Sequence, residues 1–208
     1  TDSIGVLLQY PLNNTIKKNI SKIVHQEDST DKKTGVLGFI GAGGFTENYI
    51  LPSIKQTKGV FRGISSINGF TSTSLAKKFK FDYSTSNYID ILNDSKIDTV
   101  FITTQHDTHS KFIIETLNAK KNVFVEKPLA ITPNQLKSVI TAFEKNKSNS
   151  LTIGFNRRFS SHMLAVQESL IPQKGPISIS ITINAGFISK ESWVHDIKRG
   201  GGRIIGEA

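Results

Sequence analysis

The sequence predicts an α/β protein, in which a doubly wound parallel sheet is followed by the start of an α+β domain with an open, mainly antiparallel sheet. Two observations lead to this prediction. Between residues 36 and 153, short apolar runs alternate with helix-like stretches, and the runs contain little polar alternation. Such strands are typical of a parallel sheet that helices cover on both faces. After residue 176 the pattern changes to a period of two, which indicates a strand with one wet face.

Five apolar runs predict the strands of the parallel sheet, at residues 36–40, 60–64, 99–103, 123–125 and 151–153. Helices are expected between them, near 45–57, 73–80, 86–94, 108–119 and 132–146. The last helix has the clearest start, because Thr132 can cap it, Pro133 suits its first position and Gln135 completes a capping box. Residues 35–154 therefore form one doubly wound domain.

Both flanks of this domain are predicted to be incomplete. Residues 155–208 are expected to begin a second domain, since Ile177, Ile179, Ile181 and Ile183 share one strand face. Residues 1–34 are interpreted as a tail or connector, because "HQEDSTDKKTG" at 25–35 is polar and rich in turn formers. The chain begins without Met and ends on "GGGRIIGEA" with no stop signal, so we expect a fragment.

Composition narrows the class of ligand. The chain of 208 residues has a net charge of +9, which favours anionic partners, but its 26 Lys and Arg form no run of five. A small phosphate-bearing ligand is therefore favoured over nucleic acid. The absence of Cys fits a reducing cytoplasm. There is no leader, and no run approaches the roughly 18 apolar residues of a membrane span. We expect a cytoplasmic protein without a membrane partner.

The first strand leads directly into "GAGGFTENYILP", which begins like the dinucleotide fingerprint G-x-G-x-x-G. Gly41 permits a tight turn, and Gly43 lets the backbone approach a pyrophosphate at the N-terminus of the next helix. The third position is Thr46, so the helix is expected to lie slightly further from the strand. An ordinary glycine-rich turn is the alternative interpretation.

The segment after the second strand bears on the choice of cofactor. An NAD-specific domain usually carries an acidic residue here for the ribose 2′-hydroxyl, but "GISSINGFTSTSLAKKF" has no carboxylate. This favours NADP, or no discrimination between NADP and NAD; a solvated polar loop is the alternative. The groups that can accept a 2′-phosphate are Ser65, Ser66, Thr71, Ser72, Lys77 and Lys78.

Two more polar segments follow strands at the same edge of the sheet. "TTQHDTH" places His109 where it can cap or line the crevice, whereas His106 fits either the crevice or a surface loop. No carboxylate or cysteine set accompanies these histidines, so no metal site is predicted. In "NVFVEKPLAIT", Lys127 beside Glu126 can act as a proton donor or substrate anchor. A salt-bridged turn is the alternative.

Together, "GFIGAGGF", "TTQHDTH", "NVFVEKPLAIT", "IGFNRRFS" and "KRGGGRIIGEA" resemble the Gfo/Idh/MocA oxidoreductase family in order and spacing, over about residues 35–208. The likeness is greatest to bi-domain members with an upstream alcohol-dehydrogenase-like region, whose last strand residues 4–10 resemble. The resemblance implies a Rossmann domain at 35–154 that binds NAD(P), then a substrate domain whose sheet often forms a homo-oligomer. It further implies hydride transfer between nicotinamide and a carbon of a sugar- or cyclitol-like substrate.

The same resemblance implies roles for individual residues. Lys127 would be catalytic, in a Lys127–Pro128 pair that is often cis, and Asn156 and Arg157 would approach cofactor or substrate. The complete set expected at the cofactor is Gly41, Ala42, Gly43, Gly44, Phe45, Thr46, Ser65, Ser66, Thr103, Thr104, His106, His109, Glu126, Lys127, Pro128, Asn156 and Arg157.

One departure from the family pattern concerns its acid/base histidine, which lies in a D-x-G-x-H stretch after the G-G-G segment. Alignment on that segment sets Gly206 in the Asp slot and places the His two residues past Ala208. His195 is not assigned this role. The alternative function is therefore a non-catalytic NAD(P)-binding module, a cofactor sensor or scaffold.

Overall fold

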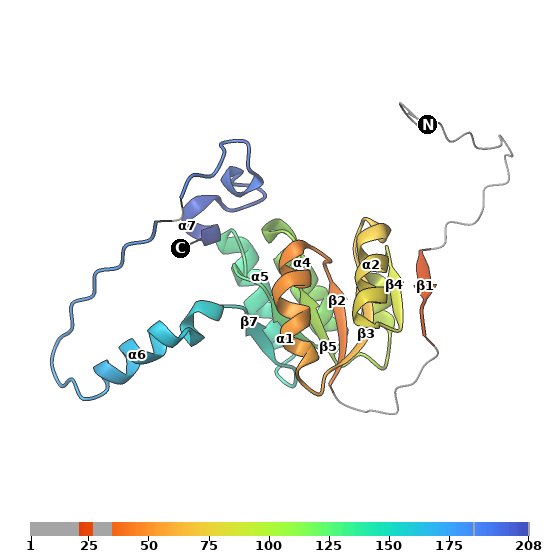
Figure 1. Ribbon diagram of the computed structural model, residues 1–208, viewed down its shortest axis with the longest axis horizontal. Helices are drawn as coiled ribbons and strands as arrows, with labels where there is room; N and C mark the ends of the chain where they lie inside the picture. Colours follow the sequence, from red (N-terminus) through yellow and green to blue (C-terminus); the bar gives the residue numbers. More distant parts are fainter. Residues whose placement is uncertain (1–20, 27–34, 185, 208) are drawn as a thin grey trace, which may run out of the picture.

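The computed structural model describes residues 21–26, 35–184 and 186–207. The strand expected at 4–10 and most of the expected connector lie outside these residues. Seven strands form one sheet in the order β1-β4-β3-β2-β5-β6-β7 (Figure 1). Every pairing in this sheet is parallel except that of β1 with β4. The predicted doubly wound parallel sheet is thereby confirmed.

The parallel strands are β2 (Val36–Ile40), β3 (Val60–Ser65), β4 (Tyr83–Thr85), β5 (Thr99–Ile102), β6 (Asn122–Val125) and β7 (Leu151–Ile153). Five of them were predicted to within one residue at each end. The sequence did not reveal β4, which has three residues and two polar side chains. Ser84 and Thr85 are buried there because hydroxyl bonds satisfy them, to Thr73 at 3.0 Å and to Asp90 at 2.6 Å respectively.

The five predicted helices are all present, as a π-helical turn η1 (Thr46–Ile50) continued by α1 (Leu51–Lys55), and as α2 (Gly69–Phe79), α3 (Ile89–Asn93), α4 (His106–Asn118) and α5 (Pro133–Glu144). Helix α2 starts earlier than expected because the side chain of Asn68 caps it. The capping box of Thr132 and Gln135 is confirmed. In η1, the Leu51 N–H donates to Thr46 O, directly before Pro52, which has no N–H to donate.

Apolar side chains form a separate core on each face of the sheet. On the face covered by α4 and α5, Val100 and Val123 pack with Ile113 and Leu117 of α4. On the face covered by α1 and α2, Phe39 contacts Phe81 edge-on, with ring centroids 5.5 Å apart. Because both faces are buried, β2 carries no polar alternation, which is the pattern that predicted a parallel sheet.

Strand β1 (Lys22–Val24) extends the sheet beyond β4 with an antiparallel pairing. The Ser86 N–H donates to Ser21 O at 2.8 Å, and the His25 N–H donates to Asp82 O at 2.7 Å. The Lys22 ammonium lies 3.8 Å from the centroid of the Tyr83 ring. Six residues of the segment interpreted as a connector are therefore attached to the domain.

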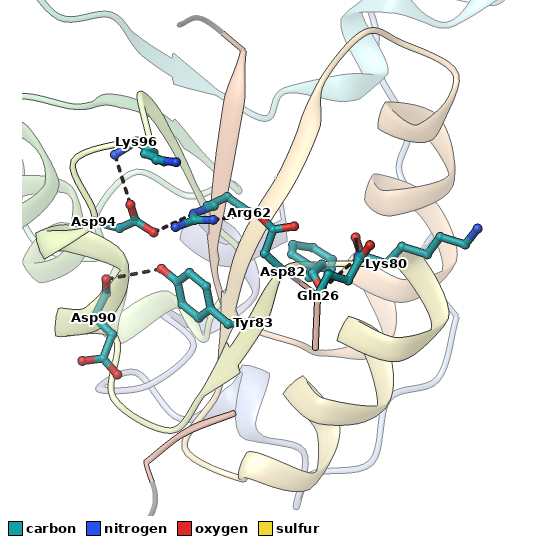
Figure 2. Close-up of polar contacts among 9 residues, drawn as sticks. Gln26, Arg62, Lys80, Asp82, Tyr83, Asp90, Asp94 and Lys96 are labelled. Carbon is teal, nitrogen blue, oxygen red and sulfur yellow. Dashed lines mark hydrogen bonds and ion pairs between the residues drawn. The ribbon is translucent and has the colours of Figure 1, made fainter. Parts of the chain in front are cut away.

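A cluster of ion pairs lies near the N-terminal edge of the parallel strands (Figure 2). The Arg62 guanidinium bridges Asp82 and Asp94, at 2.8 and 2.9 Å. Beside it, the Tyr83 hydroxyl donates to Asp90 O at 3.3 Å. Burial, together with the charge of Asp94, raises the pKa of Tyr83 well above its usual value, so the phenol stays neutral.

The C-terminal part contains η2 (Asn156–Phe159), α6 (Ser161–Leu170), η3 (Trp193–His195) and α7 (Gly202–Glu207). Helix α6 extends away from the sheet, and the chain then returns to α7 beside the start of α5 (Figure 1). The strand predicted at 177–183 is not formed in this structure. A strand needs a hydrogen-bonding partner, and no described strand lies beside these residues. Their isoleucines are exposed instead.

No helix within residues 21–26, 35–184 and 186–207 combines the length and the apolar character that crossing a bilayer requires.

The packing of Tyr83 over β3 predicts a stability effect. A Cβ added at Gly63 would lie 2.6 Å from Tyr83 Oη and 2.7 Å from its Cε2. We expect Gly63→Ala to lower the free energy of unfolding by about 1–3 kcal/mol through overpacking, measured by urea denaturation. Gly175→Ala is the control, because no atom lies within 4 Å of its added Cβ. Equal effects of the two substitutions would contradict this packing.

Candidate functional site

The candidate site lies at the carboxyl edge of the parallel strands, where β2 has β3 on one side and β5 on the other. This is the topological switch point at which open α/β sheets bind ligands. A crevice of about 590 Å³ opens there. Of the residues predicted for the cofactor, those that line it are Gly41, Ala42, Gly43, Gly44, Phe45, Ser65, Ser66, Thr103 and Thr104.

Gly41 forms the tight turn between β2 and the crevice. Its φ is +114°, and a Cβ there would lie 2.7 Å from the backbone carbon and oxygen of Thr103. Only glycine fits both conditions. Thr46 is fully buried, and its hydroxyl donates to Thr103 Oγ1 at 2.7 Å, which in turn donates to Gly41 O at 3.2 Å. Two threonine hydroxyls thus tie the helix start, the turn and the end of β5 together.

Gly43 differs from Gly41 because the space around it is open. No atom lies within 4 Å of a Cβ added there, and for Gly44 the nearest atom lies 3.8 Å away. The Glu47 N–H donates to Gly43 O at 3.0 Å, which begins the helix. The N–H groups of residues 44–46 therefore belong to the first turn, where amides have no acceptor within the helix. This arrangement suits a phosphate group.

Hydroxyl groups gather at the other end of the crevice, after β3. Ser65 is buried and donates to Phe39 O at 3.2 Å, whereas Ser66 shares a hydrogen bond of 2.9 Å with Thr71 and donates to Asn68 O. No carboxylate or cation is present among the residues that line the crevice, all of which are described. Lys77 and Lys78 lie in the last turn of α2, and Lys78 pairs with Glu47 at 2.6 Å.

Sequence reasoning missed several residues that line the crevice. Tyr88 and Phe112 form an aromatic wall, with ring centroids 4.8 Å apart. Ser86 and Tyr88 were missed because they follow β4, which was itself missed. The others end β2, follow Ser66, or lie on and before α4, where spacing of three and four residues marks one helix face. The missed set is Ile40, Ile67, Ser86, Tyr88, Gln105, Thr108 and Phe112.

The turn after β6 places Lys127 at the same edge of the sheet. The Lys127–Pro128 peptide is cis, as the family resemblance implied. The Lys127 ammonium donates to Gly206 O at 2.6 Å. Gly206 cannot carry a side chain there, since a Cβ would lie 2.6 Å from Gly200 O. Gly206, which the resemblance set in the Asp slot, thus offers the lysine a backbone carbonyl.

Glu126 faces a different space from the crevice. Its carboxylate approaches Gly154 and lines an apolar groove of about 450 Å³ together with Asn156. Burial raises the pKa of Glu126, while the Lys127 N–H and the lysine charge act in the opposite direction. Phe45 borders both the groove and the crevice and so separates them. Arg157 is exposed on η2.

Both histidines of "TTQHDTH" are buried behind the crevice. His106 Nδ1 lies 2.8 Å from Gly200 O, and its ring meets Trp193 edge-on at 4.8 Å. His109 lies between Pro128 and Thr104. No group of three His, Asp or Glu residues that could hold a metal occurs in the described part of the chain. His195 Nε2 approaches Ile188 O at 3.4 Å.

Comparison with known proteins settles the family. Residues 36–155 match the Gfo/Idh/MocA model, described as "Oxidoreductase family, NAD-binding Rossmann fold". The chain belongs to this family. The matched residues hold the turn at Gly41, the crevice and the Lys127–Pro128 turn. Among the solved structures that resemble this chain, one is a complex with NAD(H) and another is a complex with NADP.

Two curated relatives and one solved structure illustrate the likeness. The chain is 32% identical over 132 residues to the uncharacterized oxidoreductase YrbE of Bacillus subtilis, which covers 64% of this chain and 38% of the relative. It is 34% identical over 110 residues to inositol 2-dehydrogenase of Salmonella typhimurium, covering 53% and 29%. Myo-inositol dehydrogenase from Lactobacillus casei, in complex with NAD(H) and myo-inositol, superposes with a TM-score of 0.61 at 22% identity, covering 65% and 40%.

The sequence identities and the shares of each chain that are covered determine how much the comparisons establish. At 22% identity the Lactobacillus structure shows the fold alone. The chain spans only about a third of the length of the two curated relatives, 38% and 29% respectively. The chain therefore contains the family's NAD-binding Rossmann domain, and the curated relatives that it matches are longer.

Proposed function

We propose that this chain supplies the cofactor domain of an NAD(P)-dependent oxidoreductase that transfers hydride between nicotinamide and a carbon of a sugar- or cyclitol-like substrate. The observation that carries the proposal is that the Gly41–Thr46 turn and the Lys127 turn follow parallel strands, β2 and β6, and so lie at the same edge of the sheet. Family membership and the inositol dehydrogenase among the relatives support the reaction and substrate class.

The residues of the crevice fit a dinucleotide. The open space at Gly43 lets a pyrophosphate approach the backbone, and the first-turn amides of residues 44–46 would donate to it. The hydroxyls of Ser66 and Thr71 would bond to the adenosine ribose. When bound, the cofactor supplies the hydride chemistry, while the protein binds and orients it.

Lys127 would move the proton that accompanies hydride transfer. Its ammonium is held at the end of β6, with Gly206 O as a fixed acceptor. A positioned lysine can donate a proton to a carbonyl oxygen that becomes a hydroxyl, and its neutral form can accept one in the reverse direction. In the crevice itself, the lining residues offer only hydroxyl, amide and apolar groups.

The cofactor preference follows from the lack of charge at the ribose end. No lining carboxylate repels a 2′-phosphate there, and no lining cation attracts one. We therefore propose that the site accepts both cofactors and favours NADPH slightly, by less than about tenfold, or ~1.4 kcal/mol.

Residues 155–207 would begin the substrate domain of the longer protein. Its open antiparallel sheet would include 177–183, whose exposed isoleucines need partner strands, and this sheet would join copies into a homo-oligomer. Residues 1–34 would follow an alcohol-dehydrogenase-like region upstream.

The open space at Gly43 predicts how binding responds to a bulky side chain. We expect Gly43→Leu to weaken NADH and NADPH binding at least about tenfold, measured by calorimetry, because the side chain would occupy the place of the pyrophosphate. Its unfolding midpoint should be unchanged, since no neighbouring atom is displaced. Gly175→Leu is the matched control. Equal affinity of Gly43→Leu and the unsubstituted chain would contradict this cofactor site.

The role of Lys127 is tested in the full-length protein by hydride transfer to or from a panel of cyclitols and aldoses. We expect Lys127→Met to lower kcat by about 10²–10⁴ with little change in the Kd of NADH. Lys147→Met is the control, because that lysine pairs with Glu144 on the surface. If both variants retained full activity, Lys127 would have no catalytic role.

The alternative is a non-catalytic NAD(P)-binding module. It is supported by the bond from Lys127 to the backbone carbonyl of Gly206, the residue that the family resemblance sets in the Asp slot. It predicts that the full-length protein binds NADH and transfers hydride to none of these polyols.

A further inference from the structure

One histidine connects the two loops that meet at the candidate site. His109 is fully buried in the first turns of α4. Its Nδ1 lies 2.8 Å from Pro128 O, and its Nε2 lies 3.0 Å from Thr104 O. Pro128 directly follows Lys127, and Thr104 lines the crevice. A single ring therefore spans from the turn that carries the ammonium to a wall of the cofactor crevice.

The two neighbours of this ring compete for one proton. Both are carbonyl oxygens, which only accept hydrogen bonds, so a ring nitrogen must carry hydrogen to bond to either. Burial lowers the pKa of His109 and outweighs the hydrogen bonds to Pro128 O and Thr104 O, which raise it. The smaller effects of the His106 ring, which lowers this pKa, and of Asp107, which raises it, oppose each other. With its pKa below the ordinary value, the ring is expected to be mainly neutral at pH 7 and to carry one N–H. The shorter of the two distances, 2.8 Å to Pro128 O against 3.0 Å to Thr104 O, favours that hydrogen on Nδ1.

We propose that His109 is the positioning residue for Lys127: its Nδ1–H donates to the Pro128 carbonyl and fixes the turn from which the ammonium reaches the reacting atoms. The catalytic consequence rests on the proposed function, but the hydrogen bond does not.

The chemistry of proline explains why a side chain is needed to hold this turn. Pro128 has no N–H, so its carbonyl is the only polar backbone group with which this buried residue can be held. The tip of Lys127 is tied separately, to Gly206 O. His109 therefore fixes the backbone end of the side chain and Gly206 its charged end. Rigid support of this kind is what catalytic geometry requires.

The first test is the tautomer of His109 in the ¹⁵N-labelled 208-residue chain, observed by long-range ¹H–¹⁵N correlation at pH 7. The proposal predicts a protonated Nδ1. A neutral ring protonated on Nε2 alone would overturn it, because the only hydrogen bond would then go to Thr104.

Two substitutions distinguish the role of His109 Nδ1 from that of its Nε2. An Asn amide nitrogen is as many bonds from Cβ as Nδ1, whereas a Gln amide nitrogen is as far as Nε2. His109→Asn should therefore keep the donor to Pro128, and His109→Gln should move it toward Thr104. The readout is the ¹³Cε resonance of Lys127, assigned with Lys127→Arg. We expect His109→Gln to shift this resonance and His109→Asn to leave it in place. Equal shifts in both variants, or in neither, would overturn the proposal.

Kinetics of the full-length protein extend the test. His109→Gln should lower kcat about tenfold while the KM for NADH stays unchanged. His109→Asn should keep the kcat of the unsubstituted protein. If either variant fails to fold, the tautomer of the unsubstituted ring decides. If the unsubstituted protein transferred no hydride at all, the proposed function would be contradicted. The NMR experiments would still decide whether His109 donates to Pro128 O.

Discussion

The contact between Gly41 and Thr103 is the constraint on which the rest of the site depends. Strands β2 and β5 are neighbours with Ile40 opposite Ile102, so their next residues meet directly at the switch point. A Cβ at Gly41 would overlap the Thr103 backbone, and the Thr46 hydroxyl bonds to that of Thr103. Moving this turn would therefore move the helix start and both walls of the crevice together.

Charge is distributed away from the crevice although the protein is strongly basic, with a net charge of +9. At the N-terminal edge of the sheet, Arg62 is neutralised by Asp82 and Asp94. In the crevice, backbone amides and hydroxyls provide the polar groups. Anion binding then depends on the helix start and on fixed N–H groups, which require no desolvated cation. Lys127 is not among the residues that line the crevice, and the proposed function assigns its ammonium the proton transfer.

The sequence predicted the parts of the site that local rules determine. Apolar runs locate the central strands, and Gly41 and Gly43 locate the turn between them. We did not predict from the sequence that alternate side chains of "VFVEK" face opposite sides of the sheet, although the period of two in β6 causes this. Val123 and Val125 face α4 and α5, so Phe124 and Glu126 face the opposite side and the separate groove. The position of His109 depends on its contact with Pro128, which lies 19 residues further along the chain, and no local sequence pattern predicts such a contact. The isoleucines at 177–183 have a strand pattern, but pairing depends on a partner.

The measurement that tests this account most directly is a titration of the ¹⁵N-labelled chain with NADH, followed by amide chemical shifts. We predict saturable shifts of Gly41, Gly43 and Thr103, accompanied by the first-turn amides of residues 44–46. Shifts confined to the Arg62 cluster or to the groove at Glu126, with the Gly41 turn unaffected, would contradict the account.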